Sequence, residues 1–119
     1  ISFTQLTAQT LKRKYRGIYA GQIPSYEVKF GQGINTVSEC DLKVYISRDS
    51  LKLEIGTYSY ASGYTFEIAE QDLILTAPRE QSGIPEQFIL SPRTKTILRK
   101  GHYPQPDATL IRIGKLPRR

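Results

Sequence analysis

The chain has 119 residues with one Cys, one His, no Met and no Trp, and 17 Lys and Arg against 11 Asp and Glu give it a net charge of +6. This length builds one domain with a modest core, and 39% apolar with 24% charged residues is typical of a globular protein rather than a disordered one. One Cys (Cys40) and one His exclude an internal disulfide and disfavour a zinc site, and no apolar run reaches the roughly 18 residues of a membrane-spanning helix. We therefore expect no metal, no cofactor and no transmembrane segment.

The N-terminal segment contains the one helix that the sequence favours. Residues 3–16 predict a short helix that Thr7 would cap, and an extended arm is the alternative. The chain starts with Ile1 rather than Met, which predicts a processed N-terminus. Removal of a signal peptide, and hence a secreted or periplasmic protein, is one explanation, and trimming of a recombinant chain is the other.

Most of the remaining sequence alternates apolar and polar residues with the period of two that is typical of half-buried strands. Residues 42–47 and 51–56 form the clearest pair, and the turn formers Arg48, Asp49 and Ser50 join them into a hairpin. Further strands are predicted over residues 16–20, 26–30, 57–60, 64–68, 72–76, 86–90, 94–99 and 109–113. The first two of these are expected to pair around Pro24, and a tight turn is expected at residues 61–63.

These strands predict the class of fold. About eight or nine short strands lack intervening helices, which excludes a parallel sheet with helical crossovers. Consecutive hairpins favour a small antiparallel up-and-down barrel of about eight strands, because closure removes exposed edges, and a β-sandwich is the alternative. We divide the chain into a basic arm or short helix (1–16), one barrel domain (17–113) and a basic tail (114–119).

A short motif on the first predicted strand carries a resemblance to a known family. Gly17 is followed two residues later by the aromatic Tyr19, and a meander of hairpins comes after it. This pattern resembles the calycin and lipocalin-like barrels, which usually have Trp at the second position. The resemblance covers the topology of residues 5–100. It implies a barrel closed at one end whose interior or open end binds a ligand, and it carries over no catalytic residue.

Catalytic chemistry has few candidates in this sequence. His102, the only His, lies in a loop of turn formers, and no Gly-x-Ser-x-Gly motif is present. Gly31-Gln32-Gly33 is a two-glycine turn that lacks the further residues of a phosphate-binding loop. We therefore expect a non-enzymatic binding or interaction module for a small ligand or a protein partner.

Aromatic residues on one predicted hairpin provide the first candidate binding site: Tyr58, Tyr60, Tyr64 and Phe66. Strict alternation from Leu53 sends Tyr58 and Tyr60 outward, whereas a bulge at Gly56 would turn both inward. Inward tyrosines would line a cavity, and outward ones would form a strip for a partner. The loops Ala77–Pro85 and Gly101–Asp107 are the alternative location, because long loops on a rigid barrel often carry recognition.

Charge provides the second candidate site, because the two ends of the chain are basic and the middle is acidic. Residues 1–16 carry four positive charges, residues 17–78 have a net charge of −4, and residues 79–119 have a net charge of +6. The alternative function is therefore a barrel that binds a polyanion: an acidic glycan, an anionic lipid surface or, less favoured, a nucleic acid. The candidate contacts are Lys12, Arg13, Lys14, Arg16, Arg93, Lys95, Arg99 and Lys100. Lys95 and Arg99 share one face of a predicted strand, which suggests a basic stripe.

Overall fold

The computed structural model describes residues 11–78, 84–101 and 104–116, and these confirm the predicted all-β fold. A single 3-10 turn, Arg13–Tyr15, precedes the first strand, and no helix in these ranges is long and apolar enough to cross a membrane. The strands are β1 Gly17–Ile23, β2 Tyr26–Phe30, β3 Gly33–Val37, β4 Cys40–Ile46, β5 Leu51–Ile55, β6 Tyr58–Ser62, β7 Thr65–Ala69, β8 Asp72–Ala77, β9 Glu86–Ser91, β10 Thr96–Arg99 and β11 Ala108–Gly114.

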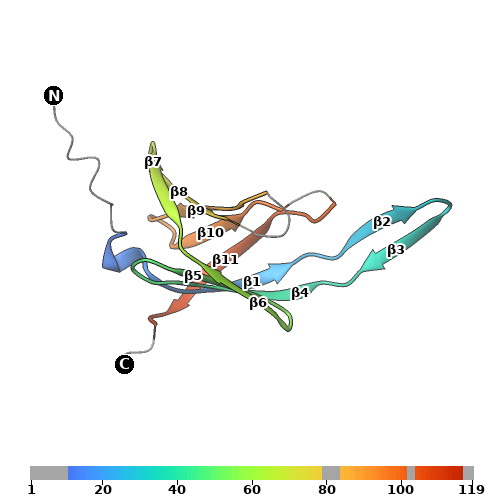
Figure 1. Cartoon of the computed structure of the whole chain (residues 1–119), viewed down its shortest axis with the longest axis horizontal. Helices are drawn as coiled ribbons and strands as arrows, with labels where there is room; N and C mark the ends of the chain where they lie inside the picture. The colour runs from blue at the N-terminus through green and yellow to red at the C-terminus, as the bar shows by residue number, and fades with distance from the viewer. Residues whose placement is uncertain (1–10, 79–83, 102–103, 117–119) are drawn as a thin grey trace.

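Nine of these strands form one antiparallel sheet in the order β6-β5-β4-β1-β11-β10-β9-β8-β7. The sheet curls strongly into a half-barrel (Figure 1), so the barrel-like architecture predicted from the sequence is confirmed. β1 pairs with both β4 and β11, which brings the N-terminal and C-terminal parts of the sheet together. The two edge strands, β6 and β7, are not hydrogen-bonded to each other. Gly63 and Tyr64 join them, and the chain runs on from one strand into the other along one curved path (Figure 1).

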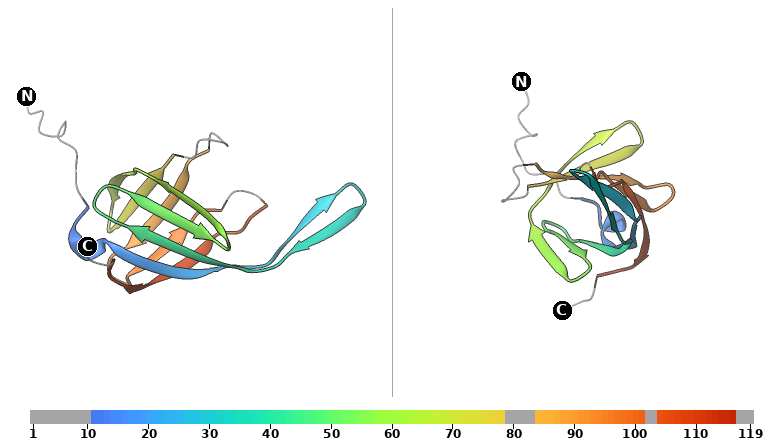
Figure 2. Two further views of the ribbon diagram at one scale, coloured as in Figure 1. Left: turned by 60° about the horizontal axis from the view of Figure 1, so that its bottom comes forward. Right: turned by 90° about the vertical axis from the view of Figure 1, so that its right-hand side faces the viewer.

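The predicted pairing of residues 16–20 with residues 26–30 was wrong. β1 pairs with β4 and β11 rather than with β2, and β2 pairs instead with β3, a strand that the sequence analysis missed. Together β2 and β3 form a separate two-stranded ribbon that projects away from the half-barrel (Figure 2). The ribbon stands clear because Pro24-Ser25 and Ser38-Glu39 interrupt the two long strands at the same level. Every residue of β3 is exposed.

A single cluster of buried apolar side chains fills the inner face of the half-barrel. Alternation places every second residue of the strands on this face, as in the pattern of β4, where Leu42, Val44 and Ile46 are buried. Leu11, which precedes the 3-10 turn, is also buried in the cluster, and the turn lies across one end of the curled sheet (Figure 2, right). The other members are Tyr19, Ile23, Leu51, Leu53, Leu73, Leu75, Ala77, Phe88, Leu90, Ile97, Ala108 and Leu110.

The turn between β5 and β6 settles which way the tyrosines face. Gly56 has a φ of +58° and is the first residue of a two-residue hairpin turn, a conformation that favours glycine. The register pairs Leu53 with Tyr60 and Ile55 with Tyr58, so both tyrosines lie on the inner face of the sheet. The inward alternative is therefore the right one, although a hairpin turn rather than a bulge reverses the phase. The tight turn expected at residues 61–63 is absent, because Ala61 and Ser62 belong to β6.

Candidate functional site

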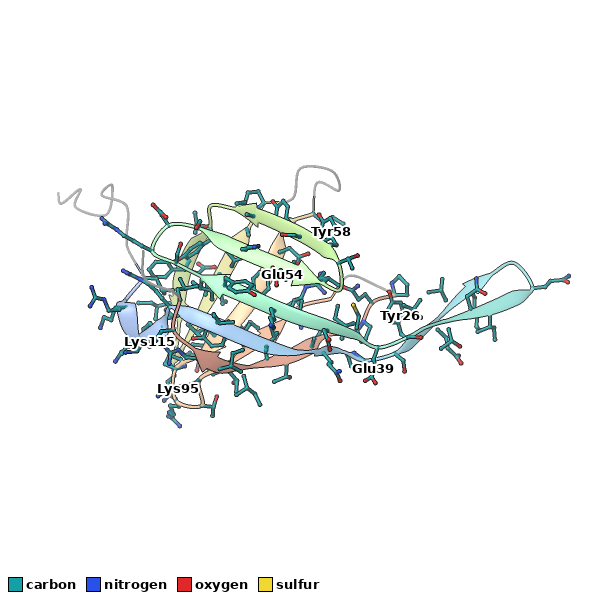
Figure 3. All side chains as sticks on the ribbon, turned by 90° about the horizontal axis from the view of Figure 1, so that it is seen from below. Tyr26, Glu39, Glu54, Tyr58, Lys95 and Lys115 are labelled. Carbon is teal, nitrogen blue, oxygen red and sulfur yellow. The ribbon has the colours of Figure 1, made fainter. Side chains whose placement is uncertain are left out.

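An open pocket of about 950 Å³ lies at the end of the half-barrel that the 3-10 turn covers. Its walls come from the segment before β1, the β4–β5 turn, the β9–β10 turn and the end of β11, and Figure 3 shows Lys95 and Lys115 together at this end. Seven cationic side chains and no carboxylate line the pocket, and we call them the basic cluster: Arg13, Lys14, Arg16, Arg48, Lys95, Arg112 and Lys115. The cavity is called the basic pocket below.

Backbone carbonyl groups hold two guanidinium groups of the basic cluster in place. Nε of Arg16 donates to the carbonyl oxygen of Leu11 at 2.9 Å. Nε and Nη2 of Arg112 donate to the carbonyl oxygen of Arg16 at 3.3 and 3.1 Å. These bonds tie the segment before β1 to β11, and they leave the positive charges without a neutralising anion.

Tyr19 and Gly17 fix the start of β1 beneath the basic pocket. Oη of the buried Tyr19 donates to the carbonyl oxygen of Tyr15 at 2.7 Å, and burial raises the pKa of Tyr19 while the nearby Arg112 opposes that rise. Gly17 has a φ of +145°, and a Cβ there would lie 2.5 Å from the carbonyl oxygen of Gly114. Glycine thus allows β1 and β11 to approach closely, which brings Arg16 and Arg112 together.

A hydrogen-bonded turn orients Arg48 toward the same pocket. Ser47 N–H donates to the carbonyl oxygen of Ser50 at 2.9 Å, which closes the β4–β5 turn. The hydroxyl group of Tyr64 donates to the carbonyl oxygens of Ser47 and Arg48 at 2.7 and 3.3 Å. Burial raises the pKa of Tyr64 to about 12, with Arg16 opposing the rise and Asp49 adding to it. Tyr64 is therefore a neutral donor that anchors the turn carrying Arg48.

The charges of the basic cluster are not balanced by acidic side chains. Within the part of the chain that the structure describes, no member of the cluster forms an ion pair with a carboxylate. Lys14 Nζ lies 5.2 Å from the centre of the Tyr15 ring, a weak cation–π contact. Like charges gathered in a cleft with low-dielectric walls focus a positive potential, which an anion would relieve. The arrangement is thus suited to holding an anion.

A second, more apolar pocket of about 360 Å³ adjoins the basic pocket. The two pockets share Tyr15 and Pro92 in their linings. We call this second cavity the apolar pocket, and its remaining lining residues are Leu11, Lys12, Phe66, Ile68, Gln71, Asp72 and Leu73.

The structure distributes the predicted polyanion contacts over four locations. Four of them line the basic pocket: Arg13, Lys14, Arg16 and Lys95. Lys12 lines the apolar pocket next to it, and Arg93 is exposed on the β9–β10 turn outside both linings. Arg99 and Lys100 lie at the far end of β10, so the stripe from Lys95 to Arg99 is not formed.

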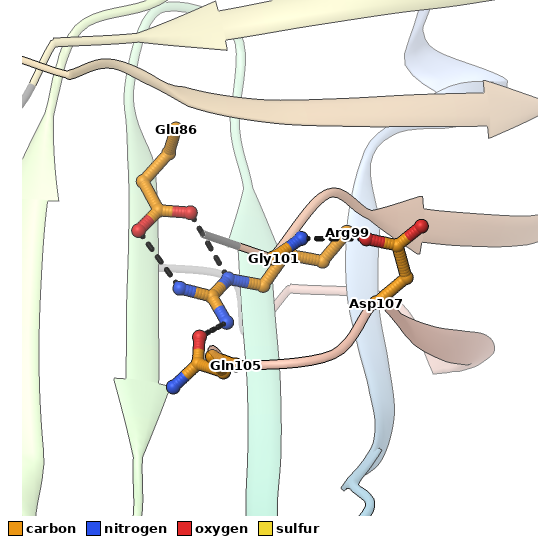
Figure 4. A network of polar contacts seen from close by, with 5 residues as sticks. All are labelled: Glu86, Arg99, Gly101, Gln105 and Asp107. Atoms are coloured by element: carbon orange, nitrogen blue, oxygen red, sulfur yellow. Dashed lines mark hydrogen bonds and ion pairs between the residues drawn. The ribbon is translucent and has the colours of Figure 1, made fainter. Parts of the chain in front are cut away.

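Arg99 points into the protein because it shares the inner face of β10 with the buried Ile97. It is only 1% exposed, and its Nε and Nη2 donate to the two carboxylate oxygens of Glu86 at 3.0 and 2.9 Å (Figure 4). Its Nη1 donates to Oε1 of Gln105. A buried guanidinium that is already bound in this way is not accessible to a surface polyanion.

Lys100, the next residue, also has a partner at this far end. Its Nζ lies 3.1 Å from Oδ2 of Asp107. The other carboxylate oxygen of Asp107 accepts the N–H of Gly101 at 2.8 Å (Figure 4). The Gly101 N–H bond and the Lys100 bond together lower the pKa of Asp107. These contacts stabilise the loop that leads into β11.

The predicted aromatic site is spread over several places. Tyr58 is 48% exposed at the far end of the half-barrel (Figure 3), and Tyr60 is partly buried beside it. Tyr64 anchors the β4–β5 turn, and Phe66 lines the apolar pocket. Neither Tyr58 nor Tyr60 lines either of the two pockets. In the loops Ala77–Pro85 and Gly101–Asp107, residues 79–83 and 102–103 lie outside the described residues, and with them His102.

Sequence reasoning missed three members of the basic cluster. Arg48 was interpreted as a turn former, and Arg112 and Lys115 were not singled out, although all three are cations at the ends of strands. Their shared signal is a position at the same level of neighbouring strands, which depends on the pairings of β1 with β4 and β11.

Comparison with known proteins identifies no family model, no curated protein and no solved structure that matches this chain. The described residues also contain no group of three or more His, Cys, Asp or Glu side chains placed to hold a metal ion.

Proposed function

We propose that this protein is a non-enzymatic binding protein whose ligand carries several negative charges and occupies the basic pocket. One observation carries the proposal: seven Lys and Arg side chains converge on one cavity whose lining has no carboxylate. Repulsion among these like charges raises the free energy of the unbound protein, and an anionic ligand would offset this repulsion.

The composition of the basic cluster favours phosphate, sulfate or carboxylate groups. Arg supplies a planar pair of donors that matches these oxyanions, and Lys adds point charges around them. The volume of about 950 Å³ lies within the range of small-molecule sites. The ligand class is therefore a multiply charged small molecule or a short segment of a longer polyanion.

A ligand in the barrel interior, which the lipocalin-like resemblance implies, has less support. Its basis is the pair Gly17 and Tyr19 on β1 and the antiparallel order of the curled sheet. The inner face, however, is occupied by the apolar cluster, and the two pockets described above lie at one end of the sheet. We therefore place the proposed binding site at the end of the half-barrel.

Titration calorimetry with inorganic tripolyphosphate, together with retention on a heparin column, tests the proposal. The double substitution Lys95→Gln/Lys115→Gln removes two charges from the basic pocket and should weaken tripolyphosphate binding at least about tenfold, since each charge-assisted hydrogen bond contributes about 1.5–3 kcal/mol. Wild-type affinity should also fall as salt rises, because the attraction is screened.

The matched control is Lys29→Gln/Lys43→Gln, which makes the same change in net charge at exposed positions on β2 and β4. This variant should bind as the wild type does. Equal weakening by both double substitutions would show that net charge, rather than the basic pocket, attracts the anion, and it would overturn the proposal.

A further inference from the structure

The apolar pocket narrows the class of ligand, an inference that rests on the proposed anion-binding function. We propose that the ligand is an anionic amphiphile: a single molecule whose charged head group lies in the basic pocket and whose hydrocarbon tail lies in the apolar pocket. The two cavities share Tyr15 and Pro92 in their linings and therefore lie side by side, so the proposed ligand would extend past these two residues from one cavity into the other.

Ile68 provides the first argument. It lies on the same face of the sheet as its cross-strand partner Leu73, which is only 6% exposed, because directly paired residues in adjacent strands share a face. Ile68 itself is 71% exposed. It is near the end of β7, an edge strand of the half-barrel, and it lines the apolar pocket together with Phe66. An inward-facing isoleucine left open to solvent is suited to contact an apolar group from a ligand.

The distribution of charge between the two cavities orients the ligand. The basic pocket has seven cations and no acid in its lining, whereas the apolar pocket has one cation, Lys12, and one acid, Asp72. Asp72 disfavours an anionic group in the second cavity, and the basic cluster attracts it to the first. The head group is therefore directed away from Asp72, and the tail is directed toward Ile68 and Phe66.

The shape of the site favours one dissolved molecule over a membrane surface. Both cavities are hollows in the protein, and the apolar pocket, at about 360 Å³, is much smaller than the basic pocket. A hollow of this size has room for one short tail beside Ile68, whereas a bilayer presents many head groups on a flat surface. We therefore expect a monomeric fatty-acid-like or alkyl-phosphate-like ligand.

The test measures the affinity for alkyl phosphates of increasing chain length, each below its micelle concentration, by titration calorimetry. Inorganic phosphate and tripolyphosphate are the tail-free probes. Affinity should rise about two- to fourfold for each added methylene until the apolar pocket is filled. Ile68→Ser should reduce this dependence of affinity on chain length and leave tripolyphosphate binding unchanged. Lys95→Gln/Lys115→Gln should lower the affinity for every anionic probe.

Ile34→Ser is the matched control, because Ile34 is a similarly exposed isoleucine on the ribbon, away from both pockets. Equal affinity for short and long alkyl phosphates would overturn the amphiphile while leaving anion binding intact. Failure to bind any phosphate probe would overturn the proposed function itself. Binding to vesicles of anionic phospholipid without binding to monomeric alkyl phosphates would contradict the dissolved ligand and favour a membrane surface. Equal affinity for an alkyl phosphate and an uncharged alcohol of the same chain length would show that the charged head group does not contribute to binding.

Discussion

The two ends of the half-barrel differ in whether their cationic side chains have carboxylate partners. At the end with the 3-10 turn, seven cations gather in an open pocket without a carboxylate. At the other end, Arg99 is buried and its guanidinium is bound by Glu86 and Gln105. The first arrangement retains an unsatisfied attraction for anions, and the second has satisfied it within the chain.

Strand β10 shows that a cation without a carboxylate partner and a buried, paired cation can lie close together in the sequence. Lys95 immediately precedes this strand and faces the basic pocket, and Arg99, four residues later, ends it in the core. The position of a cation along the chain therefore says little about its role. Burial and the presence of a carboxylate partner decide whether it supports the fold or remains available to a ligand.

The largest expected effect follows from breaking the buried pair. Arg99→Leu leaves Glu86 in the core without its guanidinium partner and should lower the free energy of unfolding by about 3–5 kcal/mol in urea denaturation. Lys95→Leu, at the other end of the same strand, should change it by about 0.5 kcal/mol or less. The double substitution Glu86→Leu/Arg99→Leu should recover much of the loss, because it removes both charges. Equal losses for Arg99→Leu and Lys95→Leu would contradict the contrast between the ends.

Next in size is stabilisation of the basic end by an anion. A ligand at one hundred times its dissociation constant should raise the free energy of unfolding by about 2.7 kcal/mol, because it binds only the folded state. Thermal denaturation with and without tripolyphosphate measures this effect. Lys29→Gln/Lys43→Gln should retain the stabilisation, and Lys95→Gln/Lys115→Gln should lose about half of it or more at the same ligand concentration. The same gain in both variants would argue against the basic pocket.

A smaller effect concerns Tyr64, which anchors the turn carrying Arg48. Tyr64→Phe removes its two hydrogen bonds to backbone carbonyls and should cost about 1 kcal/mol at neutral pH. The pKa of this hydroxyl is about 12 in the folded state and about 10 in the unfolded chain, so the unfolded state loses the proton first. The contribution of Tyr64 is therefore complete below pH 10 and is lost as pH rises from 10 to 12.

Urea denaturation of the wild type and of Tyr64→Phe across this pH range measures the difference directly. The advantage of the wild type should shrink above pH 10. A difference between the two proteins that stays constant from pH 8 to pH 12 would mean that the Tyr64 hydroxyl does not carry the shift.

The smallest expected effect is a gain. Lys95→Gln/Lys115→Gln relieves repulsion within the basic cluster and should raise the free energy of unfolding by up to about 0.5 kcal/mol at low salt, and by less at high salt. Denaturation at two salt concentrations measures it. A clear loss of stability at low salt would show that these lysines support the fold as Arg99 does.

Local pattern was enough to predict the class of fold. Alternating residues located most of the strands, because one side of the sheet is packed and the other is solvated. The same signal failed at β3, whose residues are all exposed, so that burial imposes no alternation there. The partners of β1 were also out of reach, since strand pairing between distant segments is not encoded in either strand alone.

The candidate site illustrates the same division. The basic ends of the chain are evident in the sequence, but their convergence depends on the pairing of β1 with β11. The burial of Arg99 had a usable signal: it stands two residues after Ile97 and therefore shares its face on the strand. Its partner, Glu86, is thirteen residues away on the adjacent strand and becomes its neighbour only through the register of β9 and β10.

The ribbon of β2 and β3 gives the molecule two levels of local stability within one continuous hairpin. Beyond Ile23 and Cys40, the same two chain segments leave the packed sheet and continue with only each other as partners. An isolated pair of strands is marginally stable in water, whereas β1 and β4 are protected by the core. The amide hydrogens of the ribbon should therefore exchange with solvent through local opening, whereas those of β1 and β4 should exchange only through global unfolding. The ribbon can thus open and re-form without disturbing the half-barrel.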